Sequence, residues 1–435
     1  MRRSFPRFAA AGAVAAAALA LGACGIAGGS TDSGGSTDSG DGEITGEITF
    51  QTWNLKGGYE DYLTDLVAAF EKEHPGTTVK WIDQPAEGYQ DKLSADAAAG
   101  NLPDVMDMGP ESAYTLAQAG TLLDIAKADP EAKDLYLPKA WESMTFAGVD
   151  GGTYGYPWYL NTGPSFFNTA LFDECGLDPK DLPETYDDLF SQAGVMAEKC
   201  GSDPTMIGRL PSIETFGEYG VELMNDEGTE FTFNNAKGVE YVQRYVDLYN
   251  QKGLSEEAVN ALQTAEVDGF KSGELAWMLG SSYTLNDLKD TAPKIYENLG
   301  MGPRIANVAP NMYIESLVIN SQSKNTATAQ AFAKFVTNSE NQLAFAKAAS
   351  VFPSSAGTLD DPFFTDDDGT DLAQVRIASA EQVADAAVWW PPAFSGGADS
   401  EYLREQIAQA VLGKKSAQEA LDDAVKYSND RLANQ

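Results

Sequence analysis

The sequence contains one histidine, three cysteines and far fewer basic than acidic residues. The single histidine, His74, argues against a Ser–His–Asp triad and against a metal site with several histidine ligands. Lys and Arg total 29 against 65 Asp and Glu, which gives a formal net charge of −36. Such a charge repels phosphate backbones, so we expect no nucleic acid partner. Hydrophobic residues make up 43% of the chain, which excludes global disorder.

The N-terminal segment, residues 1–23, has the charge and length of a signal peptide. Its three arginines come before an apolar run. The run soon gives way to Gly, Ser and Asp, so it is too short to span a bilayer. The run ends in Leu21-Gly22-Ala23-Cys24, which resembles a bacterial lipobox. This resemblance implies cleavage before Cys24 and acyl chains on its thiol. We therefore expect a mature lipoprotein that lies outside the cytoplasm and is anchored to the cell membrane.

The next segment, residues 24–46, holds this cysteine and a stretch made largely of Gly, Ser, Thr and Asp, which predicts a flexible linker. Beyond it, two cysteines remain, Cys175 and Cys200. Outside the cytoplasm they can form one disulfide, whose loop would contribute about 3 kcal/mol. The sequence does not show whether the two side chains approach each other, so the bonded and the free state both stay open. No histidine or third cysteine accompanies them, and we expect neither a metal nor a cofactor.

The pattern of hydrophobic residues after the linker predicts an α/β fold. Residues 47–53 alternate as a strand does, residues 59–70 place apolar side chains at helical spacing, and residues 77–82 are β-branched and short. A strand, a helix and a strand in succession form a βαβ unit, whose parallel strands are covered by helices. Further helices are expected at residues 236–249, 327–350 and 416–432, the last with the capping box Ser416-Ala-Gln-Glu419.

Short motifs follow one another in a fixed order along the same region. They are Trp53-Asn54, Phe70-Glu-Lys-Glu-His-Pro-Gly76, Leu102-Pro-Asp-Val105, Tyr154-Gly-Tyr-Pro-Trp158, Phe167-Asn-Thr-Ala-Leu-Phe172, Pro183-Glu-Thr-Tyr-Asp-Asp188 and Phe270-Lys-Ser-Gly273. In this order and spacing, behind a lipobox, the chain resembles the extracellular solute-binding proteins of carbohydrate ABC transporters, the maltose-binding-protein-like group. The resemblance covers nearly the whole chain after the linker.

The resemblance implies a two-lobed, periplasmic-binding-protein-like fold of class II, with a ligand cleft between lobes that are joined by hinge crossings. The N-terminal lobe would comprise residues 47–160 and 305–352, and the C-terminal lobe residues 161–304 and 353–435. The crossings would lie near residues 159–162, 303–310 and 352–355. Such a protein captures a sugar, here an oligosaccharide, closes around it and delivers it to the permease subunits of an ABC transporter. It would act as a monomer and would not be an enzyme.

The expected site combines aromatic platforms for the C–H faces of a sugar with polar groups for its hydroxyls. Trp53 and Asn54 follow a predicted strand, at the edge where open α/β sheets bind ligands. By the resemblance, Glu111 and Asn161 hold hydroxyls, Tyr283 replaces a stacking tryptophan, and Tyr313 and Glu315 sit in a loop that reaches the ligand. The expected ligand-binding residues are Trp53, Asn54, Glu111, Trp158, Asn161, Tyr283, Tyr313, Trp389 and Trp390.

Several alternatives stay open on the sequence. Trp158 can equally be a buried aromatic of a crossing strand, and Trp389-Trp390 can pack under the last helix. A surface glycan-active enzyme with two carboxylates across a cleft is a second class of function, and a cationic solute such as a polyamine is an alternative ligand. The acidic run at residues 360–371 lacks the spacing of an EF-hand loop, which favours a solvated loop over a calcium site.

Replacing Cys24 with alanine tests the lipid anchor. Without the thiol no acyl chain can be attached, so we expect Cys24→Ala to give soluble or unprocessed protein with unchanged solute affinity. Membrane fractionation and the mass of the chain measure this. Mature Cys24→Ala protein that stays with the membrane would refute the anchor.

Overall fold

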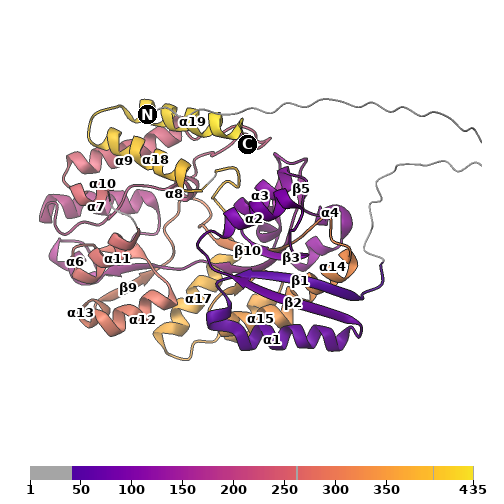
Figure 1. The fold of residues 1–435 in the computed structure, drawn as a ribbon. Helices are drawn as coiled ribbons and strands as arrows, with labels where there is room; N and C mark the ends of the chain where they lie inside the picture. The colour runs from indigo at the N-terminus through magenta and orange to yellow at the C-terminus, as the bar shows by residue number, and fades with distance from the viewer. Residues whose placement is uncertain (1–41, 261–262, 395, 435) are drawn as a thin grey trace, which may run out of the picture. The chain divides into compact units, whose positions relative to one another are not determined.

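A computed structural model describes residues 42–260, 263–394 and 396–434 of the chain. The signal peptide, Cys24 and most of the linker lie outside these residues. The described chain is an α/β structure with two main sheets, each covered by helices (Figure 1). No helix within the described residues is long and apolar enough to cross a membrane.

The chain begins its first sheet with the βαβ unit that the sequence predicts. Strand β1 (Gly46–Trp53) pairs in parallel with β2 (Thr77–Gln84) along its whole length. Helix α1 (Lys56–Glu73) connects the two strands and buries Leu63, Leu66 and Phe70, which share one helical face. The prediction of a strand, a helix and a second strand is confirmed.

The first sheet has six strands in the order β11-β6-β10-β3-β1-β2. Its remaining strands are β3 (Val105–Met108), β6 (Tyr156–Asn161), β10 (Tyr313–Ile319) and β11 (Phe352–Pro353). Strand β10 runs antiparallel to both of its neighbours, β3 and β6. The sheet is therefore completed by chain that returns from the second sheet.

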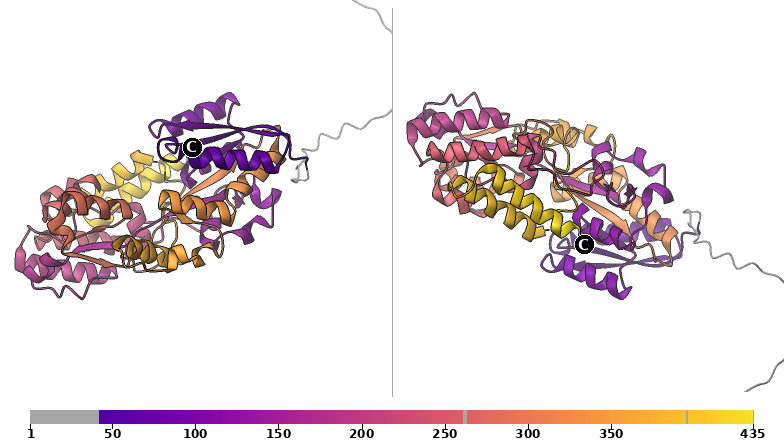
Figure 2. Two further views of the ribbon diagram at one scale, coloured as in Figure 1. Left: turned by 90° about the horizontal axis from the view of Figure 1, so that it is seen from below. Right: turned by 90° about the horizontal axis from the view of Figure 1, so that it is seen from above.

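Helices cover both faces of this sheet because its strands bury side chains on both sides. On β3, Val105 joins the aromatic cluster of Phe50 and Trp158, whereas Met106 and Met108 belong to a different cluster. Helices α1, α14 (Thr326–Val336) and α15 (Ser339–Ala349) pack on the first side, and α2 (Tyr89–Ala99) and α3 (Pro110–Gln118) on the second (Figures 1 and 2). The single helix expected over residues 327–350 is wrong, because Asn338 caps a new helix by accepting a hydrogen bond from the Asn341 N–H.

The second sheet is small and antiparallel, with the order β8-β7-β9. Its strands are β7 (Ser165–Asn168), β8 (Trp277–Leu279) and β9 (Leu299–Gly302). Helices α9 (Ala236–Asn250), α18 (Gly396–Val411) and α19 (Ala417–Leu432) pack together beside it (Figure 1). Both α9 and α19, with its capping box at Ser416 and Glu419, lie where the sequence predicts them.

Most of the other elements are short. They are α4 (Ile125–Ala128), η1 (Ala132–Leu135), α5 (Pro138–Ser143), β4 (Thr145–Phe146), β5 (Gly152–Thr153), α6 (Thr169–Glu174), α7 (Tyr186–Cys200), α8 (Ile213–Tyr219), α10 (Glu256–Asn260), α11 (Gln263–Ser272), α12 (Ser282–Thr291), α13 (Pro293–Tyr296), η2 (Thr358–Asp360), α16 (Pro362–Thr365) and α17 (Asp371–Val383). Phe364 of α16 and Val383 of α17 pack with Leu160 and Ile314 of the first sheet. The lobe boundaries expected from the sequence stay a prediction.

A buried ion pair fixes the second crossing between the sheets. The Arg304 guanidinium donates through Nε to Glu218 of α8, and both side chains are almost fully buried. The same Glu218 oxygen accepts a hydrogen bond of 2.8 Å from the Asn311 N–H, and Tyr186 Oη donates to its other oxygen. The crossing is thus attached to α8 by backbone and side-chain donors around one carboxylate.

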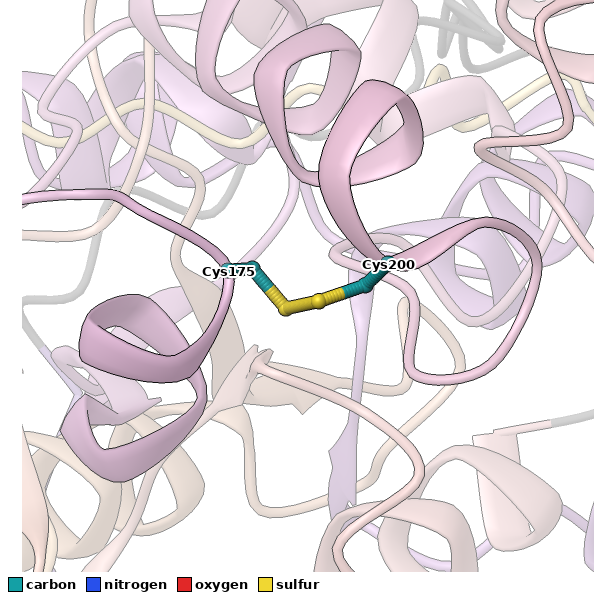
Figure 3. Close-up of a disulfide and its surroundings, with 2 residues drawn as sticks. All are labelled: Cys175 and Cys200. Atoms are coloured by element: carbon teal, nitrogen blue, oxygen red, sulfur yellow. A yellow bond between two sulfur atoms is a disulfide. The ribbon is translucent and has the colours of Figure 1, made fainter.

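A disulfide joins Cys175 to Cys200, a pairing that the sequence left open (Figure 3). Cys175 follows α6 directly and Cys200 ends α7, and their Cα atoms are 5.6 Å apart. The bond therefore ties the ends of two helices beside the second sheet.

Removing this disulfide tests its share in stability. It spans 25 residues, so the loop-closure entropy lost from the unfolded chain corresponds to about 3 kcal/mol. We expect the Cys175→Ala, Cys200→Ala double variant to lose about that much free energy of unfolding in denaturant titrations. Its solute affinity should equal that of the wild type. A double variant as stable as the oxidised wild type would contradict the prediction.

Candidate functional site

A cavity of about 380 Å³ lies at the edge of the first sheet where β1 and β3 end and β10 begins. Helices α2 and α3 start at the same edge, and the chain after α17 passes over it. The cavity is lined by Trp53, Ala86, Tyr89, Gln90, Met108, Gly109, Pro110, Glu111, Ser112, Tyr313, Ile314, Glu315, Val388 and Trp390. Its position matches the carboxyl edge at which open α/β sheets bind ligands, and its volume is typical of a small-molecule site.

Aromatic side chains form much of the cavity wall. Trp53 stacks on Tyr89, with ring centroids 6.2 Å apart and an angle of 28° between the planes. Tyr89 Oη donates to the Asp107 carbonyl oxygen, which fixes the ring behind Trp53. Trp390 donates from Nε1 to the Phe394 carbonyl oxygen at 3.1 Å, so this indole is also held by the backbone. Tyr313 is 47% exposed and leaves part of its ring free for a ligand.

Carboxyl groups supply the charged part of the wall. Glu111 lies in the first turn of α3, and burial raises its pKa. Glu315 is half-buried with Oε2 away from solvent, and burial raises its pKa to about 8. Among the lining residues that the structure describes, these two are the only charged ones. The cavity can therefore accept hydrogen bonds strongly and has no cation to hold an anionic group.

A third carboxyl group, Asp107, lies behind the wall. Its side chain is completely buried on β3, and burial, followed by the proximity of Glu315, raises its pKa well above the usual range. A Cβ placed on Gly109 would lie 3.7 Å from Glu315 Oε1, which puts the Glu315 carboxyl where β3 turns into α3. The end of β3 thus has a pair of acids, one facing the cavity and one behind it.

Four residues of the expected set line this cavity together. They are Trp53, Glu111, Tyr313 and Trp390. They come from β1, the start of α3, β10 and the chain after α17, so distant segments meet here. The expectation that residues 313 and 315 sit in a loop is wrong, because both belong to β10 and pair with β6.

Three other expected residues lie near this edge without lining the cavity. Asn54 is exposed directly after β1 and has a positive φ of 53°. Asn161 is exposed at the end of β6, opposite Tyr313 in the sheet. Trp389 is half-buried and donates from Nε1 to the Ala309 carbonyl oxygen.

Close packing explains the position of Trp389. A Cβ on Gly217 of α8 would lie 2.6 Å from its side chain, so only glycine permits this contact. The indole thus lies between α8 and the second crossing.

Trp158 and Tyr283 take opposite positions relative to solvent. Trp158 is completely buried and stacks on Phe345 at 5.0 Å and 19°, so the structure supports the buried-strand alternative and not a cavity contact. It shares a buried cluster with Tyr156 of the same strand, which places its ring in the core. Tyr283 is 83% exposed in the first turn of α12 and does not line the cavity.

Tyr89 and Asp107 are among the residues of the site that were missed on the sequence. Asp107 is an acid inside the short buried strand Val105–Met108, and a charged residue between two methionines of a core strand is a signal that could have pointed to it. Tyr89 gives no such signal, because it begins a helix and looks like an ordinary core residue. Within the described residues no group of three or more His, Cys, Asp or Glu is arranged to hold a metal ion.

This fold and its edge cavity define a solute-binding protein. The chain matches the bacterial extracellular solute-binding protein family over residues 56–343 and belongs to that family. It is therefore a binding protein and not an enzyme.

Similar proteins of known name extend over most of the chain. The maltodextrin-binding protein MdxE of Bacillus subtilis is 24% identical over 399 residues, which cover 88% of this chain and 89% of that protein. The diacetylchitobiose binding protein DasA of Streptomyces coelicolor is 25% identical and covers 78% of this chain and 80% of its own length. The structure of the sugar-binding protein MalE from Xanthomonas citri shares the fold, with a TM-score of 0.70, 21% identity and coverage of 89% and 98%.

A comparison of two tryptophans tests the assignment of Trp158 to the core. Truncating its ring leaves a large cavity beside Phe345, so we expect Trp158→Ala to lose about 3–5 kcal/mol of unfolding free energy. The folded fraction should bind solute as the wild type does. Trp53→Ala, at the half-buried platform, should lose much less stability. A Trp158→Ala protein of normal stability and weakened binding would place this indole in the site.

Proposed function

We propose that this protein captures a sugar, and specifically an oligosaccharide, in the cavity at Trp53 and delivers it to the permease subunits of an ABC transporter. The observation that carries the proposal is the composition of the wall. Aromatic rings and carboxyl groups face one cavity at the carboxyl edge of the sheet, within a chain that belongs to a solute-binding family. The names of its relatives, which bind maltodextrin or diacetylchitobiose, support a carbohydrate.

The chemistry of a sugar suits this wall. The apolar C–H face of a pyranose ring gains contact area and favourable electrostatics against an indole, and Trp53 and Trp390 are both held from behind. Sugar hydroxyls donate hydrogen bonds, and carboxylates such as Glu111 accept them more strongly than neutral groups do. An anionic sugar fits less well because the described lining residues include no Lys or Arg.

The two sheets would carry the two lobes of the binding protein. We propose the boundaries given by the sequence, residues 47–160 and 305–352 for one lobe and 161–304 and 353–435 for the other. Closure of the lobes around the solute would bring further side chains to it. Asn54, Asn161, Tyr283 and Trp389 are the candidates. The anchor at Cys24 and a monomeric state complete the proposal, and a lipoprotein among the relatives supports the anchor.

One observation favours a second ligand class, a cationic solute such as a polyamine. The charged groups that line the cavity in the described chain are carboxyl groups, and these attract cations. A thermal-shift screen with maltotetraose, diacetylchitobiose, a galacto-oligosaccharide and spermidine separates the two classes, because a ligand bound by the native state raises the melting temperature. A response to spermidine alone would replace the sugar by the cation.

Truncation of the platforms tests where the sugar binds. Removing an aromatic face that covers one sugar ring forfeits about 1.5–3 kcal/mol of burial. We expect Trp53→Ala and Trp390→Ala each to weaken the best oligosaccharide of the screen by about 10- to 150-fold in calorimetric titrations. Tyr283→Ala is measured beside them and reports whether α12 contacts the solute. Wild-type affinity in both tryptophan variants would remove the cavity from the proposal.

A further inference from the structure

Two further cavities continue from the one at the edge of the first sheet, which is called the first cavity from this point. The second cavity, of about 330 Å³, shares Gln90, Glu111 and Ser112 with the first. Its other lining residues include Gly397 of α18 and Arg431 of α19. The third cavity, of about 370 Å³, adjoins the second at Gly397. The three cavities therefore form one path from the first sheet to the helices beside the second sheet.

The third cavity differs from the first in the charge of its wall. Arg209 and Arg404 line it, and Glu401, which is exposed, is the one acid among its described lining residues. With Arg431 of the second cavity, three of the six arginines in the described chain lie along this path. The charged lining residues described for the first cavity are all acids. An anionic group that the first cavity cannot hold thus has cations within reach further along the path.

Arg404 is the arginine of this wall whose charge has no counterpart in the described chain. Its side chain is half-buried and makes no ion pair, hydrogen bond or ring contact with a described residue. The protein has 65 acidic residues, so an arginine that lines a cavity and pairs with none of those described is unusual here. Such a residue indicates a ligand that brings its own negative charge.

Ser400 provides a second, independent indication of a polar ligand. It lies four residues before Arg404 on α18, so the two side chains share one face of the helix. Ser400 lines the third cavity, and its hydroxyl oxygen is shielded from solvent without a hydrogen-bond partner among the described residues. A shielded hydroxyl without a partner is unfavourable, and a ligand oxygen in this cavity would supply the missing hydrogen bond.

Arg209 is the firmly held donor of the same wall. It donates from Nε to the buried Glu266 at 3.2 Å and from Nη1 to Ser212 Oγ at 3.4 Å. A guanidinium has five N–H donors, so these two bonds fix its plane and leave other donors for a ligand. The first turn of α18 adds the positive end of a helix dipole to the same region.

We propose that the third cavity binds the anionic group of an acidic oligosaccharide, whose uncharged units lie in the first and second cavities. The inference rests on the proposed function for the sugar part of the ligand, and it narrows the ligand to sugars with a carboxylate or a phosphate ester near one end. Either group offers a guanidinium two oxygens. The net charge of −36 repels anions at long range, but salt at about 0.15 M screens exposed charges beyond about 8 Å. The groups that line the third cavity therefore decide what it binds.

The test measures affinity by calorimetric titration with matched acidic and neutral sugars. The sugars of the screen are prepared with one carboxylate at the reducing or the non-reducing end, and each acid is compared with its uncharged methyl amide. We expect the wild type to bind the better acid about ten-fold or more tightly than its amide. Arg404→Gln should bring the two affinities close together, and Ser400→Ala should reduce the preference in part. The 6-phosphates of the same sugars form a further arm, in which a preference that Arg404→Gln abolishes assigns the site to a phosphate ester.

Arg244→Gln serves as the matched control, because Arg244 of α9 pairs with Asp187 and lines none of the three cavities. It should keep the preference of the wild type. If the wild type binds neither acid nor phosphate better than the neutral sugar, or if Arg404→Gln keeps the preference, the inference is overturned and the binding of neutral sugars still supports the proposed function.

Failure of every sugar rejects the proposed function and leaves the anion site to a separate measurement. The probe is then glucuronate alone, and the readout is the melting temperature. A rise that the wild type and Arg244→Gln show and Arg404→Gln lacks retains the anion site. The absence of any rise in the wild type rejects the anion site as well.

Discussion

The insertion of β10 between β6 and β3 is the interaction on which the rest of this structure depends. This strand comes from chain that has already built the second sheet, and it pairs antiparallel with both neighbours. Its apolar residues Leu317 and Ile319 join the core of the first sheet. Its first residues reach the carboxyl edge of β3. The backbone hydrogen bonds on the two sides of β10 therefore complete the core and also assemble the cavity.

The parts that the sequence could predict are those set by local pattern. The alternation in β1, the helical spacing in α1 and the capping box before α19 each depend on residues close together in the chain, and all three are present. The break between α14 and α15 was missed because Asn338 sits within an otherwise continuous helical pattern. Strands as short as β8, with three residues, carry no period from which they could be recognised.

Local pattern located the candidate site most directly at Trp53, whereas Glu111 and Tyr313 were expected from the family resemblance. Trp53 ends β1, and this position alone indicates the edge of a sheet. Whether Trp158 of β6 is buried depends on which helices cover each face of the sheet. The strand sequence Tyr-Pro-Trp-Tyr-Leu-Asn does not indicate this. The position of Asp107 opposite Leu317, two residues from Glu315, depends on the register of two strands that are far apart in the chain. Such pairings join residues that are far apart in the chain, so they cannot be predicted from composition or from the spacing of residues.

The protein neutralises its buried acids in two different ways. Glu218 is matched by Arg304 and by backbone donors at the second crossing. Asp107 has no such cation among the described residues around it, and burial raises its pKa well above the usual range, which favours the neutral acid. The first solution is insensitive to mild changes of pH because a guanidinium stays charged, whereas the second is not. The balance of charge thus differs between two places. At the crossing, which has to keep its geometry, a cation balances the acid, whereas at the ligand site no cation does.

The buried pair at the crossing also limits how this sequence can change over generations. Replacing either Glu218 or Arg304 alone leaves an unpaired charge in the interior, a loss of about 3–5 kcal/mol. That is a large share of the stability of an ordinary domain. Joint replacement by well-packed apolar residues can be neutral, but it requires passage through one of the damaged single variants. We therefore expect the two positions to change together and not one at a time, even though the pair itself adds little net stability.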